Sequence, residues 1–348
     1  MEKITPIYQR HKELNAQFIN FYDWKMPLYY KGIIEEAKAV RSTVGIFDIS
    51  HMARFIILLN DVSSIDRLFT NDLRLLSVGR AQYTLLCNSD GGILDDTILS
   101  RLDLYRYLLV VNASNRYKIL DWLCAHRDIG MKIRDITERT GSIAIQGPEA
   151  ERLTERIFGT SLSRLKRFHL LEIDDTLISR TGYTGEDGFE IISPSEKIIN
   201  YWDKAIELGV IPCGLGSRDI LRLEAGYCLY GNELTEERNP IEAGLERFVK
   251  VNNRNFIGSE RIKDFLYNGT REKLVWFKLE EKTVPRKGNE MIYGEEKIGV
   301  VTSGGYSPFY KTSIGMGYVK RHLAVEGIHV GIRIRDTIRE AVISRSNI

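Results

Sequence analysis

The sequence lacks a hydrophobic run long enough to cross a membrane as a helix. Its longer apolar runs, such as residues 55–59, are far shorter than the roughly 20 residues that a transmembrane helix needs. The first residues carry the acidic Glu2 and no apolar stretch of the signal-peptide kind, so no secretory signal is predicted. We therefore expect a protein that works in the cytoplasm, with no membrane partner.

Cysteine is also scarce, with four residues in a chain of 348. Cys87, Cys124, Cys213 and Cys228 are widely spaced, include no CxxC pair and have no histidine at metal-ligand spacing nearby. His51 likewise has no second histidine or carboxylate at ligand spacing and is interpreted as a satisfied structural histidine. The sequence predicts no metal site, and the cysteines fit a reducing compartment.

An excess of charge of one sign is missing as well. The chain has 49 basic and 47 acidic residues and no long block of like charges, so we expect no nucleic-acid partner. Hydrophobic residues make up 43% and charged residues 28%, as in soluble globular proteins. A chain of 348 residues exceeds the usual size of one core, so two or three structural units are expected.

The most informative stretch is a predicted hairpin, residues 83–99, in which a turn of Asn, Ser, Asp and Gly separates two apolar strands. Asp95 and Asp96 are adjacent, so they must point to opposite faces of the return strand. Asp96 shares its face with Leu94 and Ile98, which predicts that it is the inward carboxylate. A buried carboxylate needs partners, and both a structural aspartate and a ligand-positioning one remain open.

A second stretch, residues 179–192, has glycines at every third position but matches neither the dinucleotide fingerprint nor the P-loop. These glycines indicate a tight turn that brings Tyr183 and Glu190 close to something flat. A carboxylate that accepts bonds from a ring N–H and an amino group can hold a pterin-like edge. The alternative interpretation is a hairpin with a solvent-facing Glu190.

A third stretch places Ser217 as the expected N-cap of a helix over residues 220–227. Arg218 then lies at the positive end of the helix dipole, where a cation is disfavoured. This indicates an acidic partner or a ligand carboxylate for Arg218, and a solvated arginine is the alternative.

The order of elements predicts an α+β fold with antiparallel sheets. After residues 268–270 only strands separated by glycine-rich turns are expected, as in a small β-barrel. No internal repeat is evident.

Several short blocks coincide with one known family. They are Trp24-x-Met26-Pro27 and residues 47–52, 70–72, 79–83, 91–96, 180–190, 214–224 and 229–233. Through these blocks the chain resembles the aminomethyltransferase, or T-protein, family of the glycine cleavage system along nearly its whole length. One departure is Tyr22-Asp23, where the family usually has Ala-Gly.

The resemblance implies a two-lobed folate-binding region, residues 1–272, and a C-terminal β-barrel, residues 273–348, with three subdomains in a ring around tetrahydrofolate. Lobe A would comprise residues 1–51 and about 139–240, and lobe B residues 52–138 with about 241–272. The implied reaction moves the aminomethyl group from the lipoyl arm of H-protein to tetrahydrofolate. It releases ammonia and forms 5,10-methylenetetrahydrofolate.

The resemblance also implies roles for the residues singled out above. Asp96 matches the catalytic carboxylate next to folate N10, and Tyr83 and Tyr183 match aromatic residues that line the folate. Glu190 matches the acid that holds the pterin, and Arg218 matches a residue near the folate. Tetrahydrofolate is the acceptor substrate, the partner is lipoylated H-protein, and no metal is implied.

Two rivals come from the same superfamily. A folate-dependent demethylase of small methylated amines or sulfur compounds would share Tyr183 and Glu190 but need no H-protein. A non-enzymatic folate-binding factor for iron–sulfur assembly would carry a Lys-Gly-Cys-Tyr-x-Gly-Gln-Glu block, which the sequence lacks. Asn232-Glu233 instead follow the T-protein form.

Overall fold

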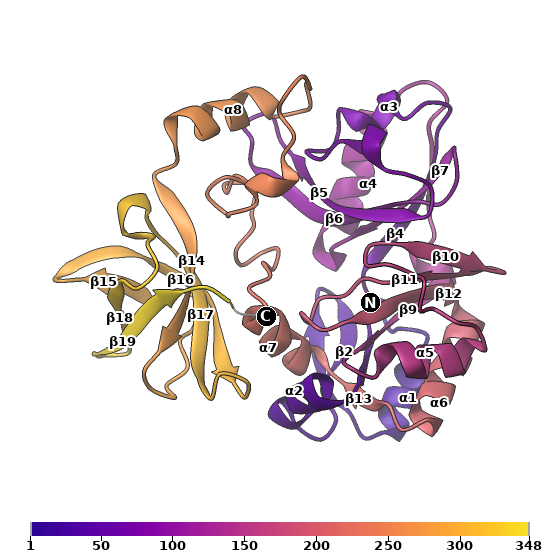
Figure 1. Ribbon diagram of the computed structural model, residues 1–348, viewed down its shortest axis with the longest axis horizontal. Coiled ribbons are helices and arrows are strands. Elements are labelled where there is room, and N and C mark those ends of the chain that lie inside the picture. Colours follow the sequence, from indigo (N-terminus) through magenta and orange to yellow (C-terminus); the bar gives the residue numbers. More distant parts are fainter. Residues whose placement is uncertain (1, 347–348) are drawn as a thin grey trace. The chain divides into compact units, whose positions relative to one another are not determined.

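The computed structural model describes residues 2–346 and is drawn in Figure 1. Internal contacts divide the chain into two compact units, and the division passes through strands β5 and β6 and helix α7. Unit 1 comprises Met1–Asp66, Asp72–Tyr83 and Thr97–Asp219, and unit 2 comprises Arg67–Asn71, Thr84–Asp96 and Ile220–Ile348. Among residues 2–346, none of the helices combines the length and the apolar character that crossing a bilayer requires.

Unit 1 contains a six-stranded sheet in the order β10-β11-β12-β9-β3-β13. Its strands are β3 (Gly45–Asp48), β9 (Thr140–Gln146), β10 (Leu170–Ile173), β11 (Thr176–Ser179), β12 (Gly188–Pro194) and β13 (Ile211–Cys213). Helices α5 (Ala150–Phe158) and α6 (Ser195–Glu207) lie together against one face (Figure 1). Phe189 and Ile191 of β12 point into this core, so the alternation of the strand turns Glu190 to the opposite face.

The N-terminal part of unit 1 contains α1 (Tyr8–Glu13), the antiparallel hairpin β1–β2 (Gln17–Phe21 and Trp24–Tyr29) and α2 (Ile33–Ser42). The two residues of the hairpin turn, Tyr22 and Asp23, have φ angles of 48° and 67°. Tight hairpins favour Asn and Gly at such positions, because an L side chain is strained in the left-handed region. The departure from Ala-Gly at this point therefore puts a bulky residue into a turn that favours a small one.

A five-stranded sheet has the order β5-β6-β7-β4-β8. Its strands are β4 (Ala53–Leu58), β5 (Arg80–Cys87), β6 (Ile93–Arg101), β7 (Arg106–Val111) and β8 (Lys132–Asp135), and the nearby helices are α3 (Ser63–Asp66) and α4 (Arg116–Ala125). The hairpin predicted over residues 83–99 is confirmed as β5–β6. In its turn, Asn88 Oδ1 accepts the amides of Asp90 at 3.0 Å and Gly92 at 2.8 Å, which closes the loop locally.

Unit 2 contains the closed barrel β14-β17-β16-β15-β18-β19, drawn in orange and yellow in Figure 1. Its strands are β14 (Glu272–Leu279), β15 (Glu290–Tyr293), β16 (Glu296–Ser307), β17 (Thr312–Lys320), β18 (His329–Ile334) and β19 (Thr337–Ser344). The inward side chains, among them Phe277, Met291 and Ile332, form one buried core. The other helices are α7 (Leu215–Glu224), shared with unit 1, and α8 (Ser259–Asn268).

Short 3₁₀ turns link these elements: η1 (Leu73–Leu75), η2 (Ala113–Asn115), η3 (Thr137–Arg139), η4 (Glu246–Phe248) and η5 (Arg321–Leu323). The predicted α+β class with antiparallel sheets and a C-terminal β-barrel is confirmed. The division into lobes A and B stays a prediction.

Candidate functional site

The paired aspartates of β6 differ in burial, but in the opposite sense to the prediction. Asp95 is 0% exposed, whereas Asp96 is half-buried. The face that Asp95 shares with Ile93 and Thr97 is fully covered, while on the Asp96 face Ile98 is only partly covered. The prediction that Asp96 is the more inward carboxylate is therefore wrong. Its partial exposure leaves it accessible to a bound molecule.

Two groups of unit 2 lie within electrostatic range of Asp96. Burial raises the pKa of the Cys228 thiol well above its usual value, and the Glu233 and Asp96 carboxylates add to the rise. Burial also raises the pKa of Tyr230, with smaller contributions from nearby carboxylates that include Asp95 and Asp96. Tyr230 is oriented by its hydroxyl, which donates to the Ile93 carbonyl at 3.3 Å. Both groups therefore stay uncharged at neutral pH.

Two glycines of this stretch, Gly182 and Gly188, make room for one buried side chain, Gln146. A Cβ on Gly182 would lie 1.9 Å from the Gln146 carboxamide oxygen, and one on Gly188 would lie 2.4 Å from its nitrogen. Gln146 donates to the Thr181 carbonyl at 3.1 Å and accepts from the Thr184 hydroxyl at 3.0 Å. Gln146, which the sequence analysis did not identify, thus stabilises the loop that carries Tyr183 through hydrogen bonds.

Tyr183, Glu190 and Arg218 form one group in unit 1, the Tyr183 group. The Arg218 guanidinium carbon lies 4.9 Å from the centre of the Tyr183 ring and 6.0 Å from that of Phe47. Burial lowers the pKa of Arg218, while the negative charge of Glu190 and the proximity of Tyr183 counteract the shift. One Glu190 oxygen accepts the Thr181 hydroxyl at 2.6 Å.

The Tyr183 group offers an aromatic face, an anionic acceptor and a cation. Arg218 Nη1 is shielded from solvent and has no hydrogen-bond partner among residues 2–346. Tyr83 is half-buried on β5 and also belongs to unit 1, whereas Asp96 belongs to unit 2. Four of the five predicted site residues therefore belong to unit 1, and three of these four form the Tyr183 group.

Helix α7 begins at Leu215, so the prediction that Ser217 is its N-cap is wrong. Ser217 Oγ instead donates to the Gly214 carbonyl at 2.8 Å and to Glu36 Oε2 at 3.1 Å. The buried Glu36 also accepts the Gly214 amide at 2.9 Å. The Glu36 carboxylate from α2 thus accepts hydrogen bonds from groups at the start of α7. The local sequence could not reveal this partner.

His51 is 4% exposed, and its Nδ1 has no hydrogen-bond partner among residues 2–346. The interpretation as a satisfied histidine is therefore wrong for this nitrogen. The ring packs edge-on against Phe21 with 5.6 Å between centroids. Burial lowers the pKa of His51 to about 3, although the Asp48 carboxylate opposes the shift. The imidazole is consequently neutral across the physiological range.

Replacing His51 by Gln is expected to reduce the amount by which the free energy of unfolding falls as the pH is lowered. Folded His51, with a pKa of about 3, excludes the proton that the unfolded chain binds below pH about 6.5. The wild type therefore loses stability as pH falls from about 6.5 towards 3, by up to about 1.4 kcal/mol per pH unit from this group. Urea unfolding from pH 7 to 4 measures the difference.

The matched control is His322→Gln, because His322 is exposed on η5. This control should follow the wild-type curve. Parallel curves for the wild type and His51→Gln would contradict the assigned burial of a neutral imidazole.

Glu233, in the block at residues 229–233, is 0% exposed and pairs with the buried Arg222 at 2.8 Å. Its carboxylate also accepts the Leu229 amide at 2.9 Å and the Thr302 hydroxyl at 2.6 Å. Arg222 Nη2 reaches Ser303 at 2.7 Å. The pair ties α7 and the following loop to strand β16 within unit 2. The sequence indicated the block but not this function.

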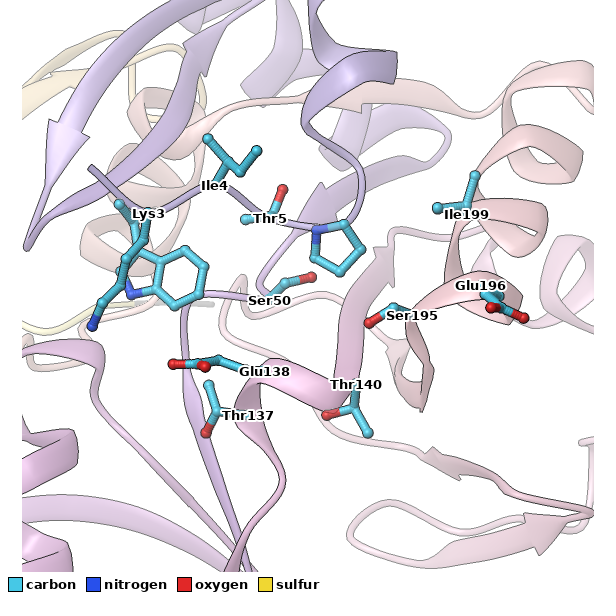
Figure 2. Close-up of a pocket in the computed structure, with 12 residues that line it drawn as sticks. Lys3, Ile4, Thr5, Ser50, Thr137, Glu138, Thr140, Ser195, Glu196 and Ile199 are labelled. Atoms are coloured by element: carbon cyan, nitrogen blue, oxygen red, sulfur yellow. The ribbon is translucent and has the colours of Figure 1, made fainter. Parts of the chain in front are cut away.

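Unit 1 also has an open cavity of about 530 Å³, lined by the N-terminal segment, the start of β9 and the start of α6. Figure 2 shows Lys3, Glu138 and Ser195 around it. It contains none of the predicted site residues. The Ser50 and Thr140 hydroxyls on its wall already bond to protein groups, so these positions do not require a ligand.

Known proteins match this chain over nearly its whole length. Residues 7–253 match the GCVT N-terminal domain, and residues 272–347 match the glycine cleavage T-protein C-terminal barrel domain. A protein of Halothermothrix orenii named aminomethyltransferase is 40% identical over 343 residues, covering 96% of each chain. One of Aquifex aeolicus with the same name is 44% identical over 331 residues, covering 95% of this chain and 91% of its own.

Among solved structures, glycine cleavage system aminomethyltransferase T from Bartonella henselae superposes with a TM-score of 0.95. It is 33% identical, and the match covers 99% of this chain and 97% of that one. The chain belongs to the glycine cleavage T-protein family. The resemblance predicted from the sequence motifs is confirmed.

Proposed function

We propose that this chain is a tetrahydrofolate-dependent aminomethyltransferase. It takes the aminomethyl group from the lipoyl arm of H-protein, transfers the one-carbon unit to tetrahydrofolate and releases ammonia. The products are 5,10-methylenetetrahydrofolate and dihydrolipoyl H-protein. Full-length relatives that carry the name aminomethyltransferase support this function. The cytoplasm is the proposed compartment, and the absence of a disulfide among residues 2–346 is compatible with it.

The observation that carries the proposal is the Tyr183 group. Tetrahydrofolate joins a flat pterin, rich in N–H donors, to a tail that ends in carboxylates. The Tyr183 ring offers a surface against which a flat ring packs, and the Glu190 carboxylate accepts ring N–H and amino donors. Arg218 supplies a cation that can donate further hydrogen bonds, because its Nη1 has no hydrogen-bond partner among residues 2–346. These three side chains are assigned to folate binding, together with Tyr83.

Asp96 is assigned to the chemistry. When a tetrahydrofolate amine attacks the aminomethyl carbon, positive charge develops at that carbon as its bond to nitrogen breaks and ammonia leaves with the proton of the attacking amine. The second folate amine then displaces the lipoyl sulfur from the same carbon, and its proton goes to the sulfur, which leaves as the thiol of the dihydrolipoyl arm. A fixed carboxylate stabilises this charge and orients the attacking amine. Asp96 is held on a strand rather than a loop, which keeps the carboxylate in one position.

The assay that tests the function is ammonia release from aminomethyl-lipoyl H-protein, with and without tetrahydrofolate. The expected result is release that requires both the loaded H-protein and tetrahydrofolate. A folate-dependent demethylase would instead convert a small methylated amine with no H-protein present. Turnover of that kind, without release from H-protein, would overturn the proposal.

Replacing Glu190 by Gln is expected to raise the KM for tetrahydrofolate by about 10- to 100-fold with a smaller change in kcat. The reason is the loss of charge-assisted hydrogen bonds, each worth about 1.5–3 kcal/mol. Glu172→Gln is the matched control, since Glu172 is an exposed glutamate on β10 of the same sheet. An unchanged KM in Glu190→Gln would remove Glu190 from the binding site.

A further inference from the structure

Three side chains that favour metal ions converge on the outer surface of the barrel. They are Glu280, His329 and Glu340, whose ligand atoms all lie within 4.8 Å of one another. No spacing in the sequence indicates this group, because its members are the residue after β14, the first residue of β18 and a residue in the middle of β19. Only the closed barrel brings them together.

The register of the strands explains the convergence. Leu279 pairs with Ala341, so the next residues, Glu280 and Glu340, stand directly opposite each other, and the Glu280 amide donates to the Glu340 carbonyl at 3.2 Å. His329 pairs with Val342, two residues from Glu340, so its ring lies diagonally across on the same face. Ala341 and Ile343 point into the core, which turns this face outward.

Two carboxylates directly opposite each other on a sheet repel. Other acidic residues of the barrel have basic partners: Glu281 pairs with Arg339 at 2.8 Å and Glu290 with Lys297 at 3.0 Å. Among residues 2–346, neither Glu280 nor Glu340 has an ion pair. Lys278, on the same face, instead lies 4.1 Å from the centre of the Tyr310 ring.

We propose that Glu280, His329 and Glu340 bind a divalent transition-metal ion of the Zn²⁺ class. One imidazole nitrogen and two carboxylate oxygens form a ligand set that such ions favour, and water completes the coordination. The two carboxylates balance the charge of the ion, which removes their repulsion. The ion joins β14, β18 and β19 and stabilises the barrel. This site is independent of aminomethyl transfer.

The test uses the full chain with Zn²⁺ as the probe, in a Cys124→Ser background because Cys124 is an exposed thiol that could bind zinc itself. Calorimetric titration should show one ion per chain, and His329→Ala should weaken binding by about tenfold or more. His322→Ala, another exposed histidine of unit 2, is the matched control and should bind as before. One-to-one binding that survives His329→Ala would overturn the proposal.

Thermal unfolding gives a second, independent readout. Zn²⁺ should raise the unfolding temperature of the parent chain, and this rise should be absent in Glu340→Gln and present in His322→Ala. Measurements in EDTA, without metal, show whether the variant folds. There Glu340→Gln should have an unfolding temperature at least as high as that of the parent, because the repulsion between the Glu280 and Glu340 carboxylates has been removed. A parent chain whose unfolding temperature does not respond to Zn²⁺ would overturn the proposal.

Discussion

Replacing Asp96 by Asn is expected to lower the rate of ammonia release by about 10²–10⁴-fold, the usual contribution of a positioned acid–base group. Asparagine keeps the shape of the side chain but not its charge, so the positive charge that develops on the aminomethyl carbon loses its counter-charge. Because Asp96 is half-buried rather than enclosed, the substitution should leave the fold intact. Single-turnover ammonia release, with tetrahydrofolate binding measured in parallel, tests this.

The neighbouring residue provides the control. Asp95 is fully buried on the opposite face of β6, so Asp95→Asn should lower stability while the folded fraction retains its turnover. The assignment of Asp96 would be lost if Asp96→Asn retained the full rate with tetrahydrofolate bound normally. A rate loss explained wholly by weaker folate binding would move Asp96 from catalysis to binding.

Replacing Glu233 by Ala is expected to lower the free energy of unfolding by about 3–5 kcal/mol, the cost of leaving one charge of a buried pair without its partner. Arg222 is 1% exposed, so water cannot replace the lost carboxylate. The Leu229 amide and the Thr302 hydroxyl would lose their acceptor as well. Urea unfolding measures the loss.

The exposed pair of Lys297 and Glu290 supplies the matched control in the same unit. Glu290→Ala should lower the free energy of unfolding much less than Glu233→Ala, because solvent screens exposed charges. Equal effects of the two substitutions would contradict the importance of the buried pair.

Strand alternation predicted much of the local structure correctly and failed at one point for a clear reason. It placed Asp95 and Asp96 on opposite faces of β6, as observed. It could not tell which face the rest of the chain covers, because burial depends on distant segments. Apolar neighbours were therefore a poor guide to which carboxylate is buried.

Contacts between distant segments account for the other differences. Ser217 was a reasonable N-cap by local pattern, but Glu36, from α2, already satisfies the start of α7. The glycines around Tyr183 indicated that another group lies close to the backbone there. That group is the side chain of Gln146, from another strand. Local sequence reports turns and periodicity, whereas these partners lie 35 and 181 positions away.

The sequence by itself determined the α+β class, the C-terminal barrel, the family and the residues to which its motifs assign function. These follow from periodicity, turn residues and short blocks, which are properties of neighbouring positions. Only the tertiary structure decided which aspartate is buried, that Arg218 lies against Tyr183, and that Glu280, His329 and Glu340 meet on the barrel. The physical reason is that burial, charge pairing and metal-type geometry depend on which strands lie side by side.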